Sequence, residues 1–358
     1  MVYMYINGIK RGIIIDDYIP VRQDGYPAFV SGHDEEVWFC LVEKAWAKMH
    51  GSYAGVASGM PCQAAYHISG VPSKSINHNN LSCEAFRNLI QGCDLRGDTM
   101  FAVTNKFESK NGIEAGQVYS LIGCIRVHSR GKIVTLVKLR DSSGKCNWQG
   151  EWSASSALWT PQLKQQSGLK EDQTDIFFMN IEEYKANFAA TSICMAVDPT
   201  TYNHSSFQHY LPDSRTAFFS FSLTKAIDCT KQCFGITIAQ QGDRLLKQCG
   251  SNSSSRPSAF SIILMTDDGK LIKATDDEAF NVTMHSADLQ TKLPAGTYIL
   301  AIDPVWNDTA KQEDAYRTIV VDIYCQERLS IFAIDVAAGF RTLKTAFKHL
   351  AKKSSAQS

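Results

Sequence analysis

Residues 215–326 carry one strand-like run after another with no helical periodicity between them, and this feature most constrains the fold. Strands that follow one another without crossover helices pair antiparallel, and two such sheets bury their apolar faces against each other. We therefore expect an antiparallel β-sandwich over residues 205–326. The runs are Ala217–Leu223, Phe234–Gln240, Phe260–Met265, Tyr298–Ile302 and Thr318–Cys325.

Residues 1–204 mix helical and strand patterns, which predicts an α+β fold. Apolar residues recur at steps of three and four from Val37 to His50, as on the buried face of a helix. Ser82 is a suitable N-cap for a second helix, which Gly92 is expected to end. Gly12–Val21 is expected to be a strand that runs into a turn at Asp16-Asp17, with Pro20 stopping it. Other predicted elements are a hairpin of Val118–Ile125 and Ile133–Leu139 around Ser129-Arg130-Gly131, and a helix over Ile181–Phe188.

Residues 327–358 form a third region, which we expect to be an amphipathic basic helix with a tail. Large apolar residues step by three or four from Leu329 through Phe332 and Val336 to Leu350, and no acid follows Ala337. Such a helix either folds back on its own domain or docks on an acidic partner surface. For docking, the predicted partner-binding residues are Phe340, Leu343, Phe347, Lys344 and Lys348.

The composition excludes several classes of function. The 36 basic and 36 acidic residues give no net charge, whereas nucleic-acid binders carry a basic surplus, so no nucleic-acid partner is expected. No apolar run is long enough to span a bilayer, and a membrane partner is not expected. The odd count of 11 irregularly spaced cysteines favours reduced thiols and a cytoplasmic location.

Three segments resemble, in order, the second half of the calpain cysteine-protease core. Val37–Tyr53 looks like the family's W-x-x-L-L-E-K-A-Y-A-K-L-x-G-x-Y helix. Gln117–Leu121 with Leu139–Gly144 is similar to its G-H-A-Y-S-V and L-R-N-P-W-G runs, and Phe177–Tyr184 to its F-W-M-S-F-E-D-F segment. Leu293–Tyr298 weakly resembles the sandwich that follows in calpains. The resemblance implies a papain-like half-core over residues 1–204 and a calpain-type β-sandwich over 205–326.

The same resemblance places two degenerate positions in the catalytic site. The position that matches the family's histidine is Gln117, and the one that matches its asparagine is Asp141. A glutamine amide cannot accept and return a proton near neutral pH, and a thiol nucleophile needs such a base beside it. The family's Q-G-x-x-G-D-C-W segment would lie upstream of everything matched, so the nucleophile half is expected to be missing. No catalytic residue is therefore predicted.

No metal and no cofactor are expected either. Family members hold calcium through carboxylates in this half-core, because this hard cation needs several oxygen ligands. The matching positions here are Asn147, Ala154, Thr174 and Ile176, and none of them is acidic. Asp172 and Asp175 lie nearby but out of register.

The sequence thus predicts a calpain-like pseudoprotease that serves as a structural or binding subunit of a larger assembly. The favoured setting is cytoskeletal, as an axonemal or cortical scaffold. A second chain is expected to supply the missing half-core and to cover an apolar face around Gln117 and Trp152. Two alternatives stay open: a calcium-dependent cysteine endopeptidase subunit whose nucleophile comes from another chain, and a lipid- or calcium-responsive module acting through the sandwich.

Overall fold

A computed structural model describes residues 1–31, 36–104, 109–144, 147–170, 173–198, 200–211, 216–240, 258–277, 281–289, 291–306 and 317–355. It confirms an α+β fold with antiparallel sheets and a C-terminal helix. Contacts group the chain into two units: unit 1 holds Met1–Pro72, Val197–Cys229 and Cys233–Ser358, and unit 2 holds Ser73–Ala196 with Thr230–Gln232. The predicted domain boundaries at residues 204 and 326 separate contiguous stretches of sequence, whereas the two units combine separate segments by their contacts. The boundaries therefore stay predictions.

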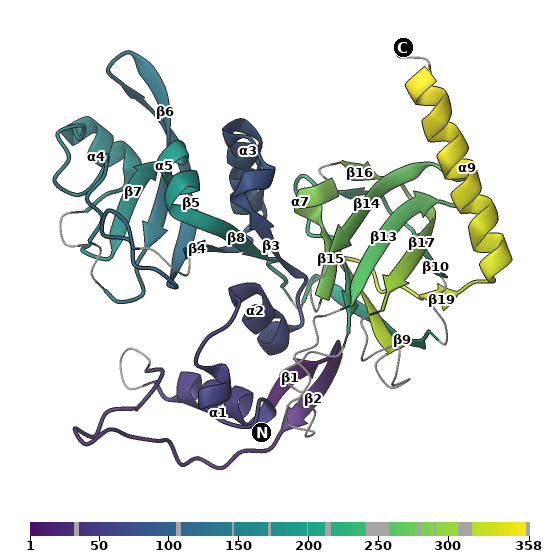
Figure 1. The fold of residues 1–358 in the computed structure, drawn as a ribbon, viewed down its shortest axis with the longest axis horizontal. Helices are drawn as coiled ribbons and strands as arrows, with labels where there is room; N and C mark the ends of the chain where they lie inside the picture. The colour runs from purple at the N-terminus through teal and green to yellow at the C-terminus, as the bar shows by residue number, and fades with distance from the viewer. Residues whose placement is uncertain are drawn as a thin grey trace. The chain divides into compact units, whose positions relative to one another are not determined.

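Unit 2 is built on a six-stranded antiparallel sheet in the order β3-β8-β4-β5-β6-β7 (Figure 1). Its elements are β3 (Ser73–Asn77), η2 (His78–Asn80), α3 (Cys83–Arg96), β4 (Thr99–Thr104), β5 (Val118–Ser129), β6 (Lys132–Arg140), α4 (Pro161–Ser167), β7 (Ile176–Asn180), α5 (Ile181–Asn187) and β8 (Phe188–Cys194). The predicted hairpin and the helix after Asn180 are confirmed as β5–β6 and α5.

Local sequence explains the turns and helix ends of unit 2. The β5–β6 hairpin turns through Arg130 and Gly131 with φ of 47° and 76°, the positive values that a tight two-residue hairpin loop requires. The Ser82 hydroxyl caps α3 by accepting the backbone N–H of Ala85 at 3.2 Å, as predicted. The prediction that Gly92 ends this helix is wrong. A glycine inside a helix costs only about 1 kcal/mol, and burial of the α3 side chains around it outweighs that cost, so α3 continues to Arg96 and Gly97 is its C-cap.

The second part of unit 1 is the predicted β-sandwich. One sheet has the order β14-β13-β17-β10-β19 and the other the order β15-β12-β18-β9, and side chains of both form one apolar core. The elements are β9 (Asn203–Tyr210), β10 (Ala217–Leu223), β11 (Ile227–Asp228), β12 (Gly235–Ala239), β13 (Ala259–Thr266), β14 (Leu271–Asp277), β15 (Asn281–His285), α7 (Ser286–Leu289), β16 (Lys292–Leu293), β17 (Gly296–Val305), β18 (Thr318–Cys325) and β19 (Phe332–Ala333).

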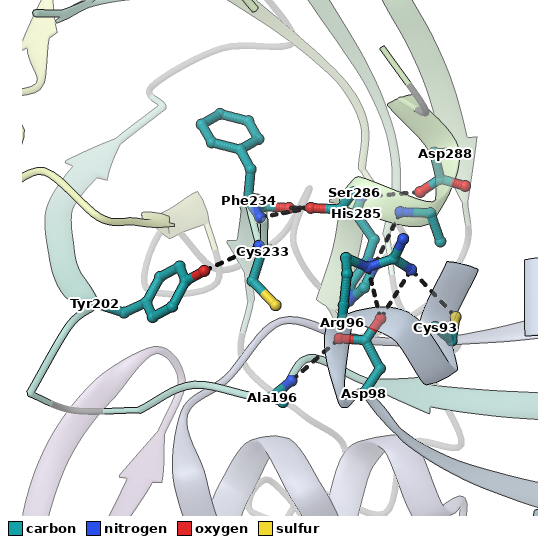
Figure 2. Close-up of polar contacts among 11 residues, drawn as sticks. Cys93, Arg96, Asp98, Ala196, Tyr202, Cys233, Phe234, His285, Ser286 and Asp288 are labelled. Atoms are coloured by element: carbon teal, nitrogen blue, oxygen red, sulfur yellow. Dashed lines mark hydrogen bonds and ion pairs between the residues drawn. The ribbon is translucent and has the colours of Figure 1, made fainter. Parts of the chain in front are cut away.

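Polar contacts tie the short helix α7 to the neighbouring strands of the sandwich (Figure 2). The Ser286 hydroxyl donates to the backbone carbonyl of Phe234 at 2.9 Å, and the backbone N–H of His285 donates to the Asp288 carboxylate at 2.8 Å. These contacts fix the chain where it leaves β15.

The N-terminal segment of unit 1 packs on the outer face of the four-stranded sheet. Its elements are β1 (Val2–Ile6), β2 (Ile9–Ile13), α1 (Trp38–Met49), η1 (Ala54–Val56) and α2 (Pro61–Ser69). Tyr66 of α2 lies against Ala239 and Val320, whose side chains alternate with those of the inter-sheet core. The Tyr66 hydroxyl donates to the carboxylate of Asp322 at 2.9 Å, and His204 Nε2 contacts the other carboxylate oxygen at 2.7 Å.

The C-terminal helix α9 (Val336–Ser355) packs on the outer face of the five-stranded sheet. Leu343 and Ala346 contact a cluster that includes Phe218, and a Cβ on Gly339 would lie 2.1 Å from the Phe218 ring, so only glycine allows this approach. The predicted helical run starts too early at Leu329, because Phe332 pairs with Ser220 as part of β19. Among the described residues, no helix is both long and apolar enough to cross a membrane.

The predicted strand over Gly12–Val21 is also wrong in extent. Strand β2 ends at Ile13, and the following residues run as an irregular segment along α1. Lys44 Nζ donates to the backbone carbonyl of Tyr18 at 2.5 Å, and Lys48 Nζ to that of Ile14 at 2.6 Å. These side-chain donors satisfy backbone groups that a strand partner would otherwise satisfy. The predicted helix over Val37–His50 is confirmed as α1.

Candidate functional site

One end of the unit 2 sheet brings together the positions that sequence analysis singled out. Strand β4 ends there, β5 begins, β6 ends and β7 begins, since neighbouring strands run antiparallel. Gln117 directly precedes β5 and Asp141 directly follows β6. Ser120 pairs with Arg140, so the register places the start of β5 beside the end of β6. We call Gln117, Asp141 and their strand-end neighbours Thr104 and Asp175 the strand-end site.

Gln117 is held through its backbone, and its side chain is exposed. Its backbone N–H donates to Thr104 Oγ1 at 2.9 Å, while the Thr104 hydroxyl and backbone N–H donate to its carbonyl at 3.0 and 3.2 Å. These contacts fix the position of the residue without using its amide side chain. Any side chain that can begin a strand would satisfy the same backbone contacts.

Asp141 uses its carboxylate in a local turn. Its Oδ1 accepts the backbone N–H of Ser143 at 2.8 Å, and its carbonyl accepts that of Gly144 at 3.2 Å. Its own backbone N–H donates to the carbonyl of Asp175 at 2.8 Å, which continues the β6–β7 pairing by one residue. An aspartate that accepts a backbone N–H two residues later is an ordinary turn former.

The two histidines of unit 2 lie away from Gln117. His128 is near the far end of the 12-residue strand β5, so about 37 Å of extended chain separates it from Gln117. His78 follows β3, which is three strands from β5 in the sheet and therefore about 14 Å away. Its ring contacts Thr191 Oγ1 at 2.8 Å, and burial lowers its pKa to about 4. Neither imidazole can act as a base at the strand-end site.

Buried thiols of unit 2 have raised pKa values. Burial raises the pKa of Cys93 strongly, and Figure 2 shows its sulfur beside Arg96, 3.3 Å from one guanidinium nitrogen. That guanidinium is paired with the Asp98 carboxylate at 2.8 Å, both side chains being almost fully buried. Burial also raises the pKa of Cys124 to about 11. These two cysteines stay protonated at neutral pH and do not supply a thiolate.

A pocket of about 220 Å³ lies beside the start of β7. Ala154, Thr174 and Ile176 line it, which are three of the positions that the family resemblance relates to calcium ligands. Lys164 and Lys170 line it as well, and two ammonium groups disfavour a divalent cation. The described residues contain no group of three potential metal ligands, and Asp172 lies outside them. The absence of a calcium site stays a prediction.

Trp152 corrects one expectation about the surface. It was expected on an exposed face with Gln117, but it is only 2% exposed and packs edge-on against Trp159 with ring centroids 4.9 Å apart. Trp152, Phe178 and Leu163 belong to one apolar cluster under α4. The face around Gln117 therefore does not include this indole, because the sheet of unit 2 already covers it.

The predicted partner-binding residues of α9 lie in two directions. Leu343 faces the sheet beneath the helix. Phe340 and Phe347 are 45% and 57% exposed, although the ring of Phe340 also touches Phe218 edge-on at 5.1 Å. Lys344 and Lys348 are exposed. The helix thus folds back on its own sheet and still presents four of the five residues outward.

The contact between Tyr66, His204 and Asp322 was not predicted from the sequence. Asp322 is 1% exposed and lies in a strand that is otherwise buried and largely apolar. A single acidic residue in such a strand indicates that its carboxylate is buried and needs a hydrogen-bonding partner. The partners themselves come from residues far away in the sequence, which no local pattern shows.

Comparison with known proteins decides the family. The sequence profile described as calpain family cysteine protease matches residues 1–195, more than half of the chain. The chain belongs to the calpain family. Human calpain-14 is 32% identical over 194 residues, Caenorhabditis elegans calpain clp-1 is 29% identical over 191, and the human calpain-1 catalytic subunit is 27% identical over 197.

Each of these alignments covers 51% of this chain, but only 24–27% of the relative. The chain therefore spans about a quarter of the length of these calpains. A structure of infectious bursal disease virus Gx strain matches 66% of this chain and 64% of its own at 12% identity, with a TM-score of 0.15. So low a score supports no conclusion about the fold.

Proposed function

We propose that this calpain-family chain has no peptidase activity of its own and acts as a structural or binding subunit. The observation that carries the proposal is Gln117, which stands where the family resemblance places the catalytic histidine. Its amide cannot take a proton from a thiol near neutral pH. Loss of general-base catalysis alone lowers a rate by about 10² to 10⁴-fold.

The geometry of unit 2 supports the proposal, because no histidine of this unit can replace the missing base. His78 is buried three strands away, and His128 lies near the opposite end of β5. Asp141, at the position of the family's asparagine, already uses its carboxylate in the turn to Ser143. The strand-end site therefore keeps the backbone arrangement of a sheet end, but none of its four residues supplies an imidazole that could take a proton from a thiol near neutral pH.

The alternative is an endopeptidase whose thiol and base come from a second chain. A thiol-reactive peptide probe separates the two functions. The purified chain is incubated with the probe, with and without calcium, first alone and then mixed with cell extract. We expect no labelling of this chain, and no labelled protein that depends on its presence.

Labelling that requires this chain, and that Gln117→Ala changes, would favour the two-chain peptidase. The matched control is Thr135→Ala, which alters a side chain on β6 away from the strand-end site.

We propose that the chain acts as a scaffold subunit in the cytoskeleton. The other candidate function is a lipid- or calcium-responsive binding module. Co-sedimentation with polymerised microtubules tests the scaffold, and co-sedimentation with liposomes that rises with calcium would favour the module. We expect binding to the polymer and none to the liposomes.

A further inference from the structure

The first half of strand β6 has a free edge. Strand β5 pairs with β6 from Lys132 to Arg140, whereas β7 pairs with it only from Leu136 onwards. Among the described residues, none pairs with the β7 side of residues 132–135. The β5–β6 hairpin therefore extends past the end of β7 (Figure 1).

Asn180 explains why β7 stops short of this edge. It pairs with Leu136 as the last residue of the strand. Its side-chain oxygen accepts the backbone N–H of Glu183 at 2.7 Å, which caps helix α5 and turns the chain away from the sheet. No residue of β7 therefore reaches the strand position opposite residues 132–135.

The free edge presents backbone groups in a defined pattern. Asp141 turns its backbone N–H towards β7, where it donates to Asp175. Alternate residues of an antiparallel strand turn their N–H and C=O to the same side, so Thr135 and Ile133 also point these groups towards the β7 side. Two donors and two acceptors thus line the edge, and such a row is a template for pairing with another strand.

A groove of about 570 Å³ runs beside this edge, and we call it the β6 groove. Residues 132–135 line one side, and Trp152 and Leu158 line another part. Val134 and Leu158 pack against the apolar cluster that includes Trp152, so this cluster reaches the groove. Ile133 points to the other face of β6 and is 55% exposed. An extended chain in the groove would therefore meet apolar side chains on both of its faces.

The two ends of the β6 groove carry opposite charge. Arg130 and Lys132 lie at the hairpin end. Glu151 and Glu182 lie at the end where β7 stops, since Glu151 Oε2 accepts the Asn180 side-chain N–H at 3.2 Å and Glu182 follows Asn180 closely in sequence. In the described part of the chain, none of these four charged residues forms an ion pair.

We propose that the β6 groove binds an extended peptide segment of a partner protein, which adds as a strand antiparallel to residues 132–135. Antiparallel pairing makes the segment start beside Glu151 and Glu182 and end beside Lys132 and Arg130. The segment therefore has a basic residue first, two apolar residues next and an acidic residue fourth. This inference rests on the proposed function and deepens it, because it names the class of partner that the binding subunit takes.

Fluorescence anisotropy with synthetic peptides tests the proposal. The probe is a fluorescein-labelled peptide with the run K-V-I-E between glycine–serine spacers, and the control peptide has the run E-V-I-K and the same composition. We expect the 358-residue chain to bind the K-V-I-E peptide. The E-V-I-K peptide should bind at least about fivefold more weakly, because both of its charged ends then meet like charges.

N-methylation of the K-V-I-E peptide tests strand pairing itself. The lysine and isoleucine of the bound run turn their N–H groups to the β6 edge, whereas the valine turns its own to solvent. A methyl group on the isoleucine nitrogen should weaken binding at least about tenfold, because it removes a donor and holds the strands apart. A methyl group on the valine nitrogen should leave the affinity within about twofold.

Variants of the chain test the charged end of the groove. Arg130→Glu with Lys132→Glu should weaken binding of the K-V-I-E peptide about tenfold and remove the preference over E-V-I-K, because both ends of the groove are then acidic. Lys110→Glu with Lys170→Glu makes the same charge change at exposed positions of unit 2 that do not line the groove, and it should bind like the unchanged chain. Circular dichroism verifies the fold of each variant.

No binding of the K-V-I-E peptide up to about 1 mM would overturn the proposal, and so would equal effects of the two methyl groups. Self-association of the chain that Arg130→Glu with Lys132→Glu abolishes, without peptide binding, would overturn it in favour of a second copy at the edge. All these results would leave the proposed lack of peptidase activity untouched. That proposal rests on the strand-end site, which lies at the other end of β6, about 16 Å of extended strand from Thr135.

Discussion

The strand-end site of unit 2 and the covered sheet face of unit 1 use polar residues in different ways. The exposed Gln117 is held through its backbone, and the half-buried Asp141 uses its carboxylate only in a local turn, so neither side chain is needed by the core. Asp322 is buried, and its carboxylate joins α2 and β9 to β18. A substitution of the exposed Gln117 side chain should therefore cost little stability, whereas a substitution of the buried Asp322 should weaken the folding of unit 1.

The largest effect should come from the apolar cluster under α4 in unit 2. Trp152→Ala should lower the free energy of unfolding of unit 2 by about 3–5 kcal/mol, because it removes a buried indole and leaves a cavity. Gln117→Ala should change that free energy by less than about 0.5 kcal/mol. Denaturant unfolding followed by hydrogen exchange of the β5–β6 amides measures both. Equal losses in the two variants would contradict the comparison.

A pH effect of similar size should come from His78. Its folded pKa of about 4 lies below the ordinary value of 6.5, so the unfolded chain binds the extra proton first as the pH falls. The stability of unit 2 should therefore be complete above pH 6.5 and fall by up to about 3 kcal/mol towards pH 4.

His78→Gln removes this titration, so its stability should vary less between pH 7 and pH 4.5 in the same unfolding experiment. If the variant loses as much stability between pH 7 and pH 4.5 as the unchanged chain, groups other than His78 cause the loss of stability in acid.

A smaller loss is expected at the polar contact of unit 1. Asp322→Ala leaves the buried Tyr66 hydroxyl without its acceptor, which costs about 1–3 kcal/mol. Asp267→Ala, at an exposed position in the same unit, is the matched control and should stay within about 0.5 kcal/mol. Thermal unfolding followed by tyrosine fluorescence compares the two. If Asp267→Ala lost as much stability as Asp322→Ala, burial of the carboxylate would not be the cause.

The smallest effect concerns a residue that sequence analysis identified correctly. Ser82→Ala removes the side chain that accepts the Ala85 N–H at the start of α3, and it should cost about 1 kcal/mol. Ser142→Ala changes an exposed serine in a turn and should be close to neutral. Denaturant midpoints of the two variants provide the measurement, and a neutral Ser82→Ala would mean that the cap contributes nothing to unit 2.

Local patterns in the sequence predicted the elements that local physics controls. The apolar spacing over Val37–His50 predicted α1, and the alternation around Arg130-Gly131 predicted the β5–β6 hairpin. Strand β9 was missed because one of its faces meets solvent, which makes Asn203–Tyr210 polar and similar to a loop. Phe332 was assigned to the helix because its apolar spacing continues that of α9, although it pairs with β10 instead.

Long-range grouping could not be predicted from local patterns. Tyr66 and Asp322 are 256 residues apart, and only the folded sheet brings them together. Gln117 and Asp141 were singled out by the family resemblance, and the pairing of Ser120 with Arg140 is what places them at one sheet end. The burial of Trp152 could not be predicted either, since it depends on packing of α4 and β7.

The most direct test of the central claim is hydrolysis of a fluorogenic calpain peptide by the purified chain, with calcium, before and after alkylation of its thiols. Because the family resemblance relates Gln117 to the catalytic histidine, and an amide cannot act as a base, we predict a rate equal to that of the peptide in buffer, unchanged by alkylation. Hydrolysis above that rate, abolished by alkylation, would contradict the account.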